Sequence, residues 1–308
     1  MIKTAQVTQS TTTQGWISGL MGVAIFAGSL PATKLAVMGF DPVFLTAVRA
    51  TLAALLGGAI LMLCKQRRPT KADLPALIVV TLGVVVGFPL LSAQALQYIT
   101  SAQAIVFLGV LPLFTAMFAV LRGGERPSAL FWLFALLGGL CIAGYAAAHS
   151  GQVSVLGALL MLGAVITCAI GYAEGARLSR TLGGWQVISW ALVISLPMML
   201  PIAYLTTPVD VFSTSATAWL GLLYVSFFSM FIGFVFWYRG LALGGIAAVG
   251  QLQLLQPFLG LILAAFLLHE AVDMGMVIST IGALLCVVAA KRLSISPAAM
   301  TASRNTSQ

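Results

Sequence analysis

The sequence predicts an all-α polytopic membrane protein with ten transmembrane helices, arranged as two inverted five-helix repeats. Composition is the first reason: 60% of the 308 residues are hydrophobic and 7% are charged, whereas soluble domains carry about 25% charged residues. The second is that the apolar residues form continuous runs, unlike the alternating pattern of a membrane barrel. The third is the one-sided placement of the basic residues. This composition excludes a soluble enzyme, a nucleic-acid binder and a disordered protein.

The apolar runs are long enough to cross a bilayer. A transmembrane helix needs about 20 apolar residues, and proline, glycine and charged residues divide the chain into ten such segments. Lipid offers no partner to an open backbone, so each segment is expected to be helical. Pro89 and Gly87 interrupt the third segment, and Gly28 and Pro31 predict a kink in the first. The expected spans are 16–36, 42–63, 74–96, 101–121, 128–147, 153–176, 185–206, 216–238, 246–268 and 272–290.

The basic residues predict the orientation. With ten spans, both termini and the connections after spans two, four, six and eight share one side of the membrane. That side carries 13 of the 15 Lys and Arg residues, and cytoplasmic segments concentrate these residues. Both termini are therefore expected in the cytoplasm, with residues 1–15 and 293–308 as tails and residues 16–147 and 153–292 as the two repeats. The basic residues on that side are Lys3, Lys65, Arg67, Arg68, Lys71, Arg122, Arg126, Arg177, Arg180, Arg239, Lys291, Arg292 and Arg304.

Spans four and nine indicate an internal repeat. They read VFLGVLPLFTAMFAVLRGGERP and LQLLQPFLGLILAAFLLHEAV; Pro112 and Pro257 are 145 residues apart, and so are Glu125 and Glu270. A five-span unit is odd, so its second copy enters the membrane upside down. Glu125 is then expected on the cytoplasmic side and Glu270 outside. Many secondary transporters build a midplane site from inverted repeats of this kind.

These features resemble a known family. Ten spans in two halves, the prolines of spans four and nine, and the GGERP and HEA segments are similar to the EamA family of the drug/metabolite transporter superfamily, over about residues 16–292. Within the superfamily the chain looks most like the YddG-type aromatic amino acid exporters. The resemblance implies a bacterial inner-membrane transporter with a central cavity that works by alternating access. The chain departs from the family's glycine-glutamate form where His269 precedes Glu270.

Two basic residues lie inside spans, where an ionisable side chain costs at least about 2.5 kcal/mol at the bilayer centre. Arg49 is a candidate contact for a substrate carboxylate; the structural alternatives are a pair with Asp41 or a cap on carbonyls of a broken helix. Lys34, near the outer end of span one, is a candidate binding residue or a side chain that reaches the interface.

Span nine is polar next to its proline. Gln253 and Gln256 are three residues apart and share a helix face, and Pro257 leaves the carbonyl of residue 253 without its helical donor. A polar, kinked midplane segment is typical of a transporter's binding site, so both glutamines are expected to bind substrate. The alternative is hydrogen bonding between helices.

Aromatic residues supply the remaining candidates. Tyr98 and Trp185 are expected to line a vestibule for a planar substrate, and Tyr172 to bind substrate near the cytoplasmic end of span six. Glu174 is expected to pair with Arg177. Trp237 and Tyr238, at the end of span eight, are expected in the interfacial belt instead.

The absence of motifs predicts the mechanism. The sequence has no phosphate-binding loop, no zinc-protease motif and no nucleophile elbow, so we expect no ATPase, other enzyme, metal or cofactor. The acidic residues stand at or near span ends, which favours facilitated carriage over proton coupling. A neutral or zwitterionic, partly apolar amino acid is the expected substrate, with the lipid bilayer as the other partner and no nucleic acid. The alternatives are a passive channel, an exporter of another substrate class and a structural membrane protein.

Overall fold

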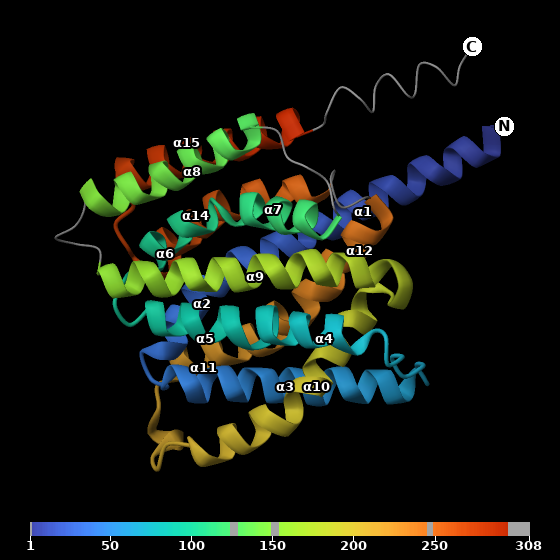
Figure 1. Ribbon diagram of the computed structural model, residues 1–308. Coiled ribbons are helices and arrows are strands. Elements are labelled where there is room, and N and C mark those ends of the chain that lie inside the picture. The colour runs from blue at the N-terminus through green and yellow to red at the C-terminus, as the bar shows by residue number, and fades with distance from the viewer. Residues whose placement is uncertain (1, 124–128, 149–153, 245–248, 295–308) are drawn as a thin grey trace.

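Helices occupy each of the ten expected spans in the computed structural model of the chain (Figure 1). The structure describes residues 2–123, 129–148, 154–244 and 249–294. In this part of the chain, six helices are long and apolar enough to cross a membrane, and three further segments form shorter apolar helices. The prediction of an all-α polytopic membrane protein is confirmed. Helix α1 (Ile2–Ala27) begins inside the segment expected to be an N-terminal tail, and the expected C-terminal tail lies almost wholly outside the described residues.

Five of the spans are single helices. Two of them begin at a side chain that caps the free N–H groups of the first turn: Asp41 Oδ1 accepts from Val43 N at 2.8 Å, and Ser154 Oγ accepts from Gly157 N at 3.3 Å. The five helices are α3 (Pro42–Leu63), α8 (Ala129–Ala148), α9 (Val155–Leu182), α10 (Gly184–Leu205) and α15 (Met274–Ser294).

The other five spans are interrupted. Two contain a π-helical segment, one contains a 3-10 segment, and two are broken at a glycine, Gly28 or Gly109. A short 3-10 turn, Val211–Ser213, lies in the connection after α10. The pieces are α1 with α2 (Ser29–Val37); α4 (Leu74–Val80), η1 (Thr81–Gly87) and α5 (Phe88–Ala95); α6 (Ser101–Leu108) with α7 (Leu111–Gly123); α11 (Ala216–Leu223), η3 (Tyr224–Ile232) and α12 (Gly233–Gly244); and η4 (Gly250–Leu255) with α14 (Gln256–Leu268).

The π segments end in bonds that skip one residue more than an α-helical bond does. Phe88 N donates to Gly83 O, and Gly233 N donates to Phe228 O. Pro89 lies directly after η1 and has no N–H to donate to the preceding turn. Irregular backbone of this kind is tolerated at membrane depth where protein or a cavity surrounds it.

The interruptions follow the repeat predicted from the sequence. Adding 145 to the bounds of α7 gives the bounds of α14, and adding 145 to the start of α8 gives the start of α15. The same shift carries the end of η1 onto the end of η3. The helical breaks are therefore duplicated together with the helices.

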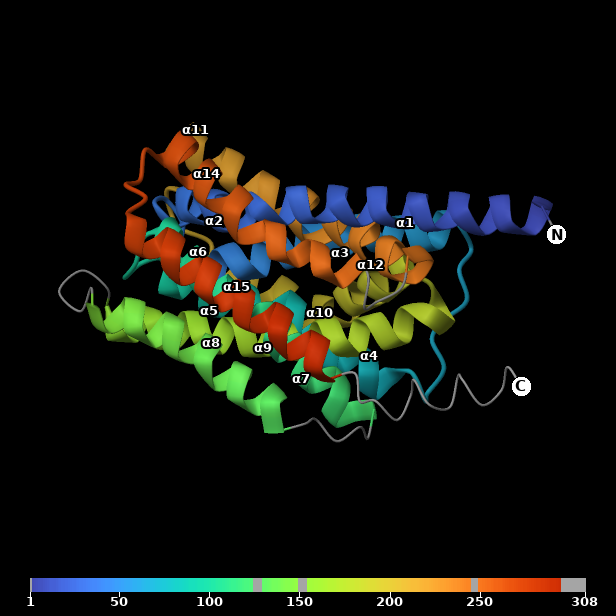
Figure 2. The same cartoon turned by 90° about the horizontal axis from the view of Figure 1, so that it is seen from above.

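The two ends of the bundle differ in charge. The N-terminal end of α1, the connection 64–73 and the C-terminal end of α15 lie together at one end (Figures 1 and 2), which carries Lys65, Arg67, Arg68 and Lys71. The opposite end carries Asp41, Asp210, Glu270 and Asp273 in its connections. This arrangement agrees with the one-sided distribution of basic residues.

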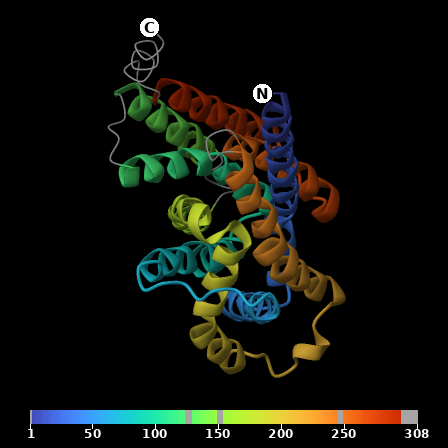
Figure 3. The same cartoon turned by 90° about the vertical axis from the view of Figure 1, so that its right-hand side faces the viewer.

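Helices α1 and α12 pack side by side through glycine, as the end-on view shows (Figure 3). A Cβ atom on Gly240 would lie 2.6 Å from the backbone nitrogen of Gly19 and 2.7 Å from its Cα. Nothing at this contact is a flexible side-chain end, so the two backbones would have to separate.

We expect Gly240→Ala to destabilise the protein by about 1–3 kcal/mol, the usual cost of overpacking. The matched control is Gly139→Ala on α8, where an added Cβ meets nothing within 4 Å and alanine improves helix propensity. Thermal unfolding in detergent measures both. Equal midpoints for Gly240→Ala and Gly139→Ala would contradict the close contact of α1 with α12.

Candidate functional site

A narrow cavity lies inside the bundle, where the interrupted helices meet. The continuous helices α3 and α9 contribute Arg49, Cys168 and Tyr172 to its wall. Each of the five interrupted spans lines the cavity with a residue at or next to its helix break. The irregular backbone segments therefore surround one site. The residues at these breaks are Ser29, Val84, Leu108, Leu111, Ser229 and Gln256.

Arg49 is the charged group of the cavity. It is 3% exposed, and its Nη2 donates to Ser229 Oγ at 3.4 Å, while Ser229 Oγ lies 2.6 Å from Ser29 Oγ. Its Nε has no hydrogen-bond partner among the described residues. A guanidinium has five N–H donors, so one hydrogen bond leaves most of the donors of Arg49 available to a ligand. Neither structural alternative is seen among the described residues: the Asp41 carboxylate caps α3, and the hydrogen bond of Arg49 goes to a serine hydroxyl and not to a backbone carbonyl.

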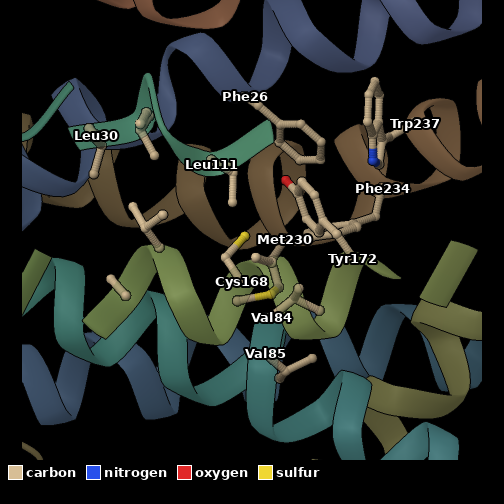
Figure 4. Close-up of a cluster of buried hydrophobic side chains, with 14 of the residues drawn as sticks. Phe26, Leu30, Val84, Val85, Leu111, Cys168, Tyr172, Met230, Phe234 and Trp237 are labelled. Atoms are coloured by element: carbon tan, nitrogen blue, oxygen red, sulfur yellow. The ribbon is translucent and has the colours of Figure 1, made fainter. Parts of the chain in front are cut away.

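Aromatic rings form one side of the cavity. Tyr172 on α9 lies between Phe234 and Trp237 of α12, with ring centroids 5.9 and 6.1 Å apart, and Phe26 of α1 lies 4.9 Å from Phe234 (Figure 4). Phe234 meets Phe26 and Tyr172 edge to face, an arrangement favoured by the ring quadrupoles. The sulfur of Cys168 lies on the same side of the cavity.

The glutamines of span nine take different places. Gln256 is 5% exposed and lines the cavity at the junction of η4 and α14. Gln253 is equally buried, one turn earlier, and its Nε2 has no hydrogen-bond partner among the described residues. The structure thus brings Arg49, Tyr172 and Gln256 together, with Gln253 in the adjoining turn.

Lys34 is not at the cavity. Its Nζ donates to Leu96 O at 2.5 Å and to Ile99 O at 3.2 Å, at the C-terminal end of α5. Lysine at a helix C-terminus satisfies free carbonyls and interacts favourably with the helix dipole. We expected Lys34 to contact substrate or to reach the interface. In the structure it instead joins α2 to the end of α5.

Tyr98 and Trp185 also lie away from the cavity and from each other. Tyr98 is 49% exposed and lines a polar surface depression with Asp41, Gln94 and Gln97. Trp185 is half-buried at the start of α10, next to Gln186, which bonds Gln66 at the basic end of the bundle. The two residues do not share a vestibule.

The expectation for Trp237 and Tyr238 is wrong. They are 2% and 0% exposed, and the indole of Trp237 packs on Tyr172 and Phe26 instead of facing an interface. The reason is that glycines of the neighbouring helices make room for both residues: an added Cβ would lie 3.0 Å from the Trp237 backbone at Gly22 of α1, and still closer to the Tyr238 hydroxyl at Gly175 of α9. Phe26, Phe234, Ser29 and Ser229 were not identified from the sequence either. The kink predicted at Gly28 could have indicated that the neighbouring Ser29 lies at the site.

Glu270 closes the acidic end of the bundle. Its carboxylate accepts from Ser101 N at 3.0 Å, Ser101 Oγ at 2.7 Å and Ala102 N at 2.7 Å, and thereby joins the connection after α14 to the first turn of α6. Anionic groups at a helix N-terminus are stabilising. Residue His269 ends α14 in the left-handed conformation (φ 52°, ψ 30°), which turns the chain towards α6. Glu125, the repeat counterpart of Glu270, lies outside the described residues.

The cavity is closed in this conformation. The volume open to the centre of a water molecule is about 20 Å³, enough for a water molecule but not for an amino acid. Binding of a larger molecule therefore requires the interrupted helices to move apart.

The comparisons with known proteins agree with this architecture. The profile of the EamA-like transporter family matches residues 13–146 and 155–291, one copy for each half of the chain. An uncharacterized transporter of Bacillus subtilis (strain 168), YdeK, is 59% identical over 283 residues, which are 92% of this chain and 99% of that protein. A second uncharacterized transporter of the same strain, YvbV, is 23% identical over 261 residues, with 82% and 84% of the two chains covered.

The fold also occurs among solved structures. One crystal structure, described only as that of a protein, superposes with a TM-score of 0.63 over 93% of this chain and 98% of its own, at 18% identity. At this identity the likeness concerns the fold alone.

Proposed function

The chain belongs to the EamA-like transporter family, and on this premise we propose that it exports aromatic or neutral amino acids and related small molecules by alternating access around the Arg49 cavity. It is a multi-pass membrane transporter and not an enzyme. The single observation that carries the choice of substrate is Arg49, a buried guanidinium with one long hydrogen bond. A charge inside a membrane protein marks a functional site by default, and a carboxylate is the partner that a guanidinium binds best.

The aromatic side of the cavity supports an amphipathic substrate. Pockets for small molecules are lined by apolar and aromatic groups with a few placed polar ones. The rings of Phe26, Tyr172 and Phe234 supply the former, and Arg49 and Gln256 supply the latter. An amino acid with an apolar or aromatic side chain matches both parts.

The orientation follows from the charges of the two bundle ends. Cytoplasmic connections concentrate Lys and Arg, so the end with the α1 N-terminus and connection 64–73 faces the cytoplasm of a bacterial inner (plasma) membrane. The end closed by Glu270 then faces outward. The antiparallel course of α7 and α14 (Figure 1) supports an inverted repeat, which provides two exchangeable closures around one site.

Facilitated carriage is the expected mode. Glu174, the acidic residue nearest to Tyr172 along α9, pairs with Arg177, as the sequence predicts. No acidic side chain lies among the described residues of the cavity wall, and proton-coupled carriers place such groups on the pathway.

Counterflow tests the function. Purified protein in liposomes loaded with unlabelled phenylalanine, without any ion gradient, is expected to take up labelled phenylalanine transiently above equilibrium and with saturation. Liposomes without protein are the control. Uptake without saturation or counterflow would indicate a channel, and uptake only under a proton gradient would contradict facilitated carriage.

A further inference from the structure

The charge balance of the cavity narrows the substrate class, on the premise that the proposed function holds. Arg49 contributes a positive charge, and no described residue of the cavity wall is acidic. The acidic groups of the neighbouring helices are engaged elsewhere: Glu174 with Arg177, and Glu270 with the first turn of α6. A zwitterionic amino acid bound at Arg49 therefore finds a partner for its carboxylate but no anion for its ammonium group.

Most of the unpartnered polar groups in and next to the cavity wall are donors. Arg49 Nε on the wall, Trp237 Nε1 beside Tyr172 and Gln253 Nε2 one turn before Gln256 are buried and have no partner among the described residues. These three atoms donate and cannot accept; the Tyr238 hydroxyl, which also has no partner there, can do both. Figure 4 shows the indole nitrogen of Trp237 turned towards Phe234 and Tyr172. Buried donors without acceptors are costly, and a carboxylate supplies acceptors but no donors.

The aromatic rings do not replace the missing anion. A ring binds an ammonium group through its face, but the rings of Phe26 and Phe234 meet edge to face with centroids 4.9 Å apart, so they do not form a pair of parallel faces that could enclose a cation. The positive charge of Arg49 in the same cavity further disfavours a second cation. The cavity wall offers an ammonium group only neutral oxygens, those of Gln256, Tyr172 and the two serines, and no anion. Burial here therefore compensates the lost hydration of an ammonium group less well than Arg49 compensates that of a carboxylate.

We propose that the transporter recognises its substrate through the carboxylate and an aromatic or apolar body, and that it carries monoanionic arylcarboxylates without an amino group at least as well as the matching amino acid. Such an anion neutralises Arg49 and fits between the rings once the cavity widens. The α-ammonium group of an amino acid is tolerated at this site and is not part of its recognition.

Three probes that differ by one group test the inference. Phenylalanine carries both charges, phenylpropanoate lacks the ammonium group and phenethylamine lacks the carboxylate. Each is used to inhibit phenylalanine counterflow in liposomes and is titrated calorimetrically into the purified full-length protein. Phenylpropanoate is expected to inhibit at the same or a lower concentration than phenylalanine. Phenethylamine should require at least about tenfold more, the loss expected for one charge-assisted contact.

A variant separates recognition from bulk hydrophobic binding. Trp237→Phe keeps a ring on Tyr172 but removes the free indole donor, so it is expected to weaken phenylpropanoate several-fold and leave phenethylamine unchanged. Trp219→Phe, at the half-buried ring that packs on Phe40, is the matched control and should change neither.

The outcomes distinguish the two proposals. Phenylalanine counterflow that phenethylamine inhibits as well as phenylpropanoate does would overturn this inference and leave the proposed function in place. Binding of phenylpropanoate without binding or counterflow of phenylalanine would support the inference and remove amino acids from the proposed function. No binding of any probe, together with no counterflow, would refute both.

Discussion

Replacing Arg49 by glutamine should lower phenylalanine counterflow by about two orders of magnitude. Arg49 supplies the positive charge of the cavity, an unpartnered Nε and an Nη2 with one long hydrogen bond, and hydrogen bonds to charged groups contribute about 1.5–3 kcal/mol each. Arg49→Gln removes more than one such hydrogen bond, because a guanidinium binds a carboxylate through two N–H groups. The measurement is the initial rate of counterflow over a range of phenylalanine concentrations, with the effect expected in the apparent affinity.

Three further measurements separate a binding role from a structural one. Arg49→Lys keeps the charge but not the forked geometry, so its loss should be intermediate, about tenfold. Arg68→Gln removes an exposed arginine in the connection after α3 and should leave transport unchanged. The midpoint of thermal unfolding of Arg49→Gln should stay level or rise, because an uncompensated buried charge is removed. A lowered midpoint with normal substrate affinity would show that Arg49 only supports the fold.

The sequence predicted those site residues whose side chains are energetically unfavourable in a membrane-spanning segment. An arginine within an apolar run, and glutamines beside a proline, are expensive in a membrane, and the structure places Arg49 and Gln256 at one cavity. Lys34 met the same criterion but caps α5, because its partners are carbonyls that lie more than 60 residues away in sequence. Phe26 and Phe234 gave no signal, since an aromatic residue in an apolar run has no excess cost.

Some features of the fold were likewise predictable from the sequence and others were not. The spans follow from hydropathy, because each must satisfy its backbone internally in lipid, and the 145-residue repeat reproduces the start and end of α14 from α7. The π segments η1 and η3 were not predictable in detail. Pro89 marked an interruption in the first, but no proline lies in η3, where the packing of neighbouring helices decides the local hydrogen bonding.

Glu270→Ala is expected to open the acidic end of the bundle, which we propose faces outward. Three hydrogen bonds to one carboxylate join the end of α14 to the start of α6, and they lie at a partly exposed site. Together they contribute about 2–4 kcal/mol, which changes the ratio of closed to open states by about 30-fold or more. The tie between α2 and α5 through Lys34 remains, so the end should loosen without loss of the fold.

Cys168 is a native reporter of this opening. Its side chain lines the cavity and is 2% exposed in the closed conformation, so an anionic, membrane-impermeant thiol reagent added from outside should react with it slowly. In a protein whose other cysteines are serine, Glu270→Ala should raise the labelling rate of Cys168 by about tenfold or more. Asp210→Asn is the matched control, since Asp210 is exposed at the same end and its charge is removed without breaking a contact between helices.

The change in the labelling rate of Cys168 shows whether Glu270 holds this end of the bundle closed or only stabilises the fold. If Glu270 holds the outward end shut, its loss raises labelling from outside and slows counterflow, because a carrier that rests in one state completes fewer cycles. If Glu270 only stabilises α6, the unfolding midpoint falls while the labelling rate of Cys168 stays as in the unmodified protein. The carboxylate contacts neither Arg49 nor the aromatic rings, so the apparent affinity for phenylalanine should change less than the maximal rate. That separation of rate from affinity is the opposite of the pattern expected for Arg49→Gln, and the two variants together assign binding and closure to different ends of the same pathway.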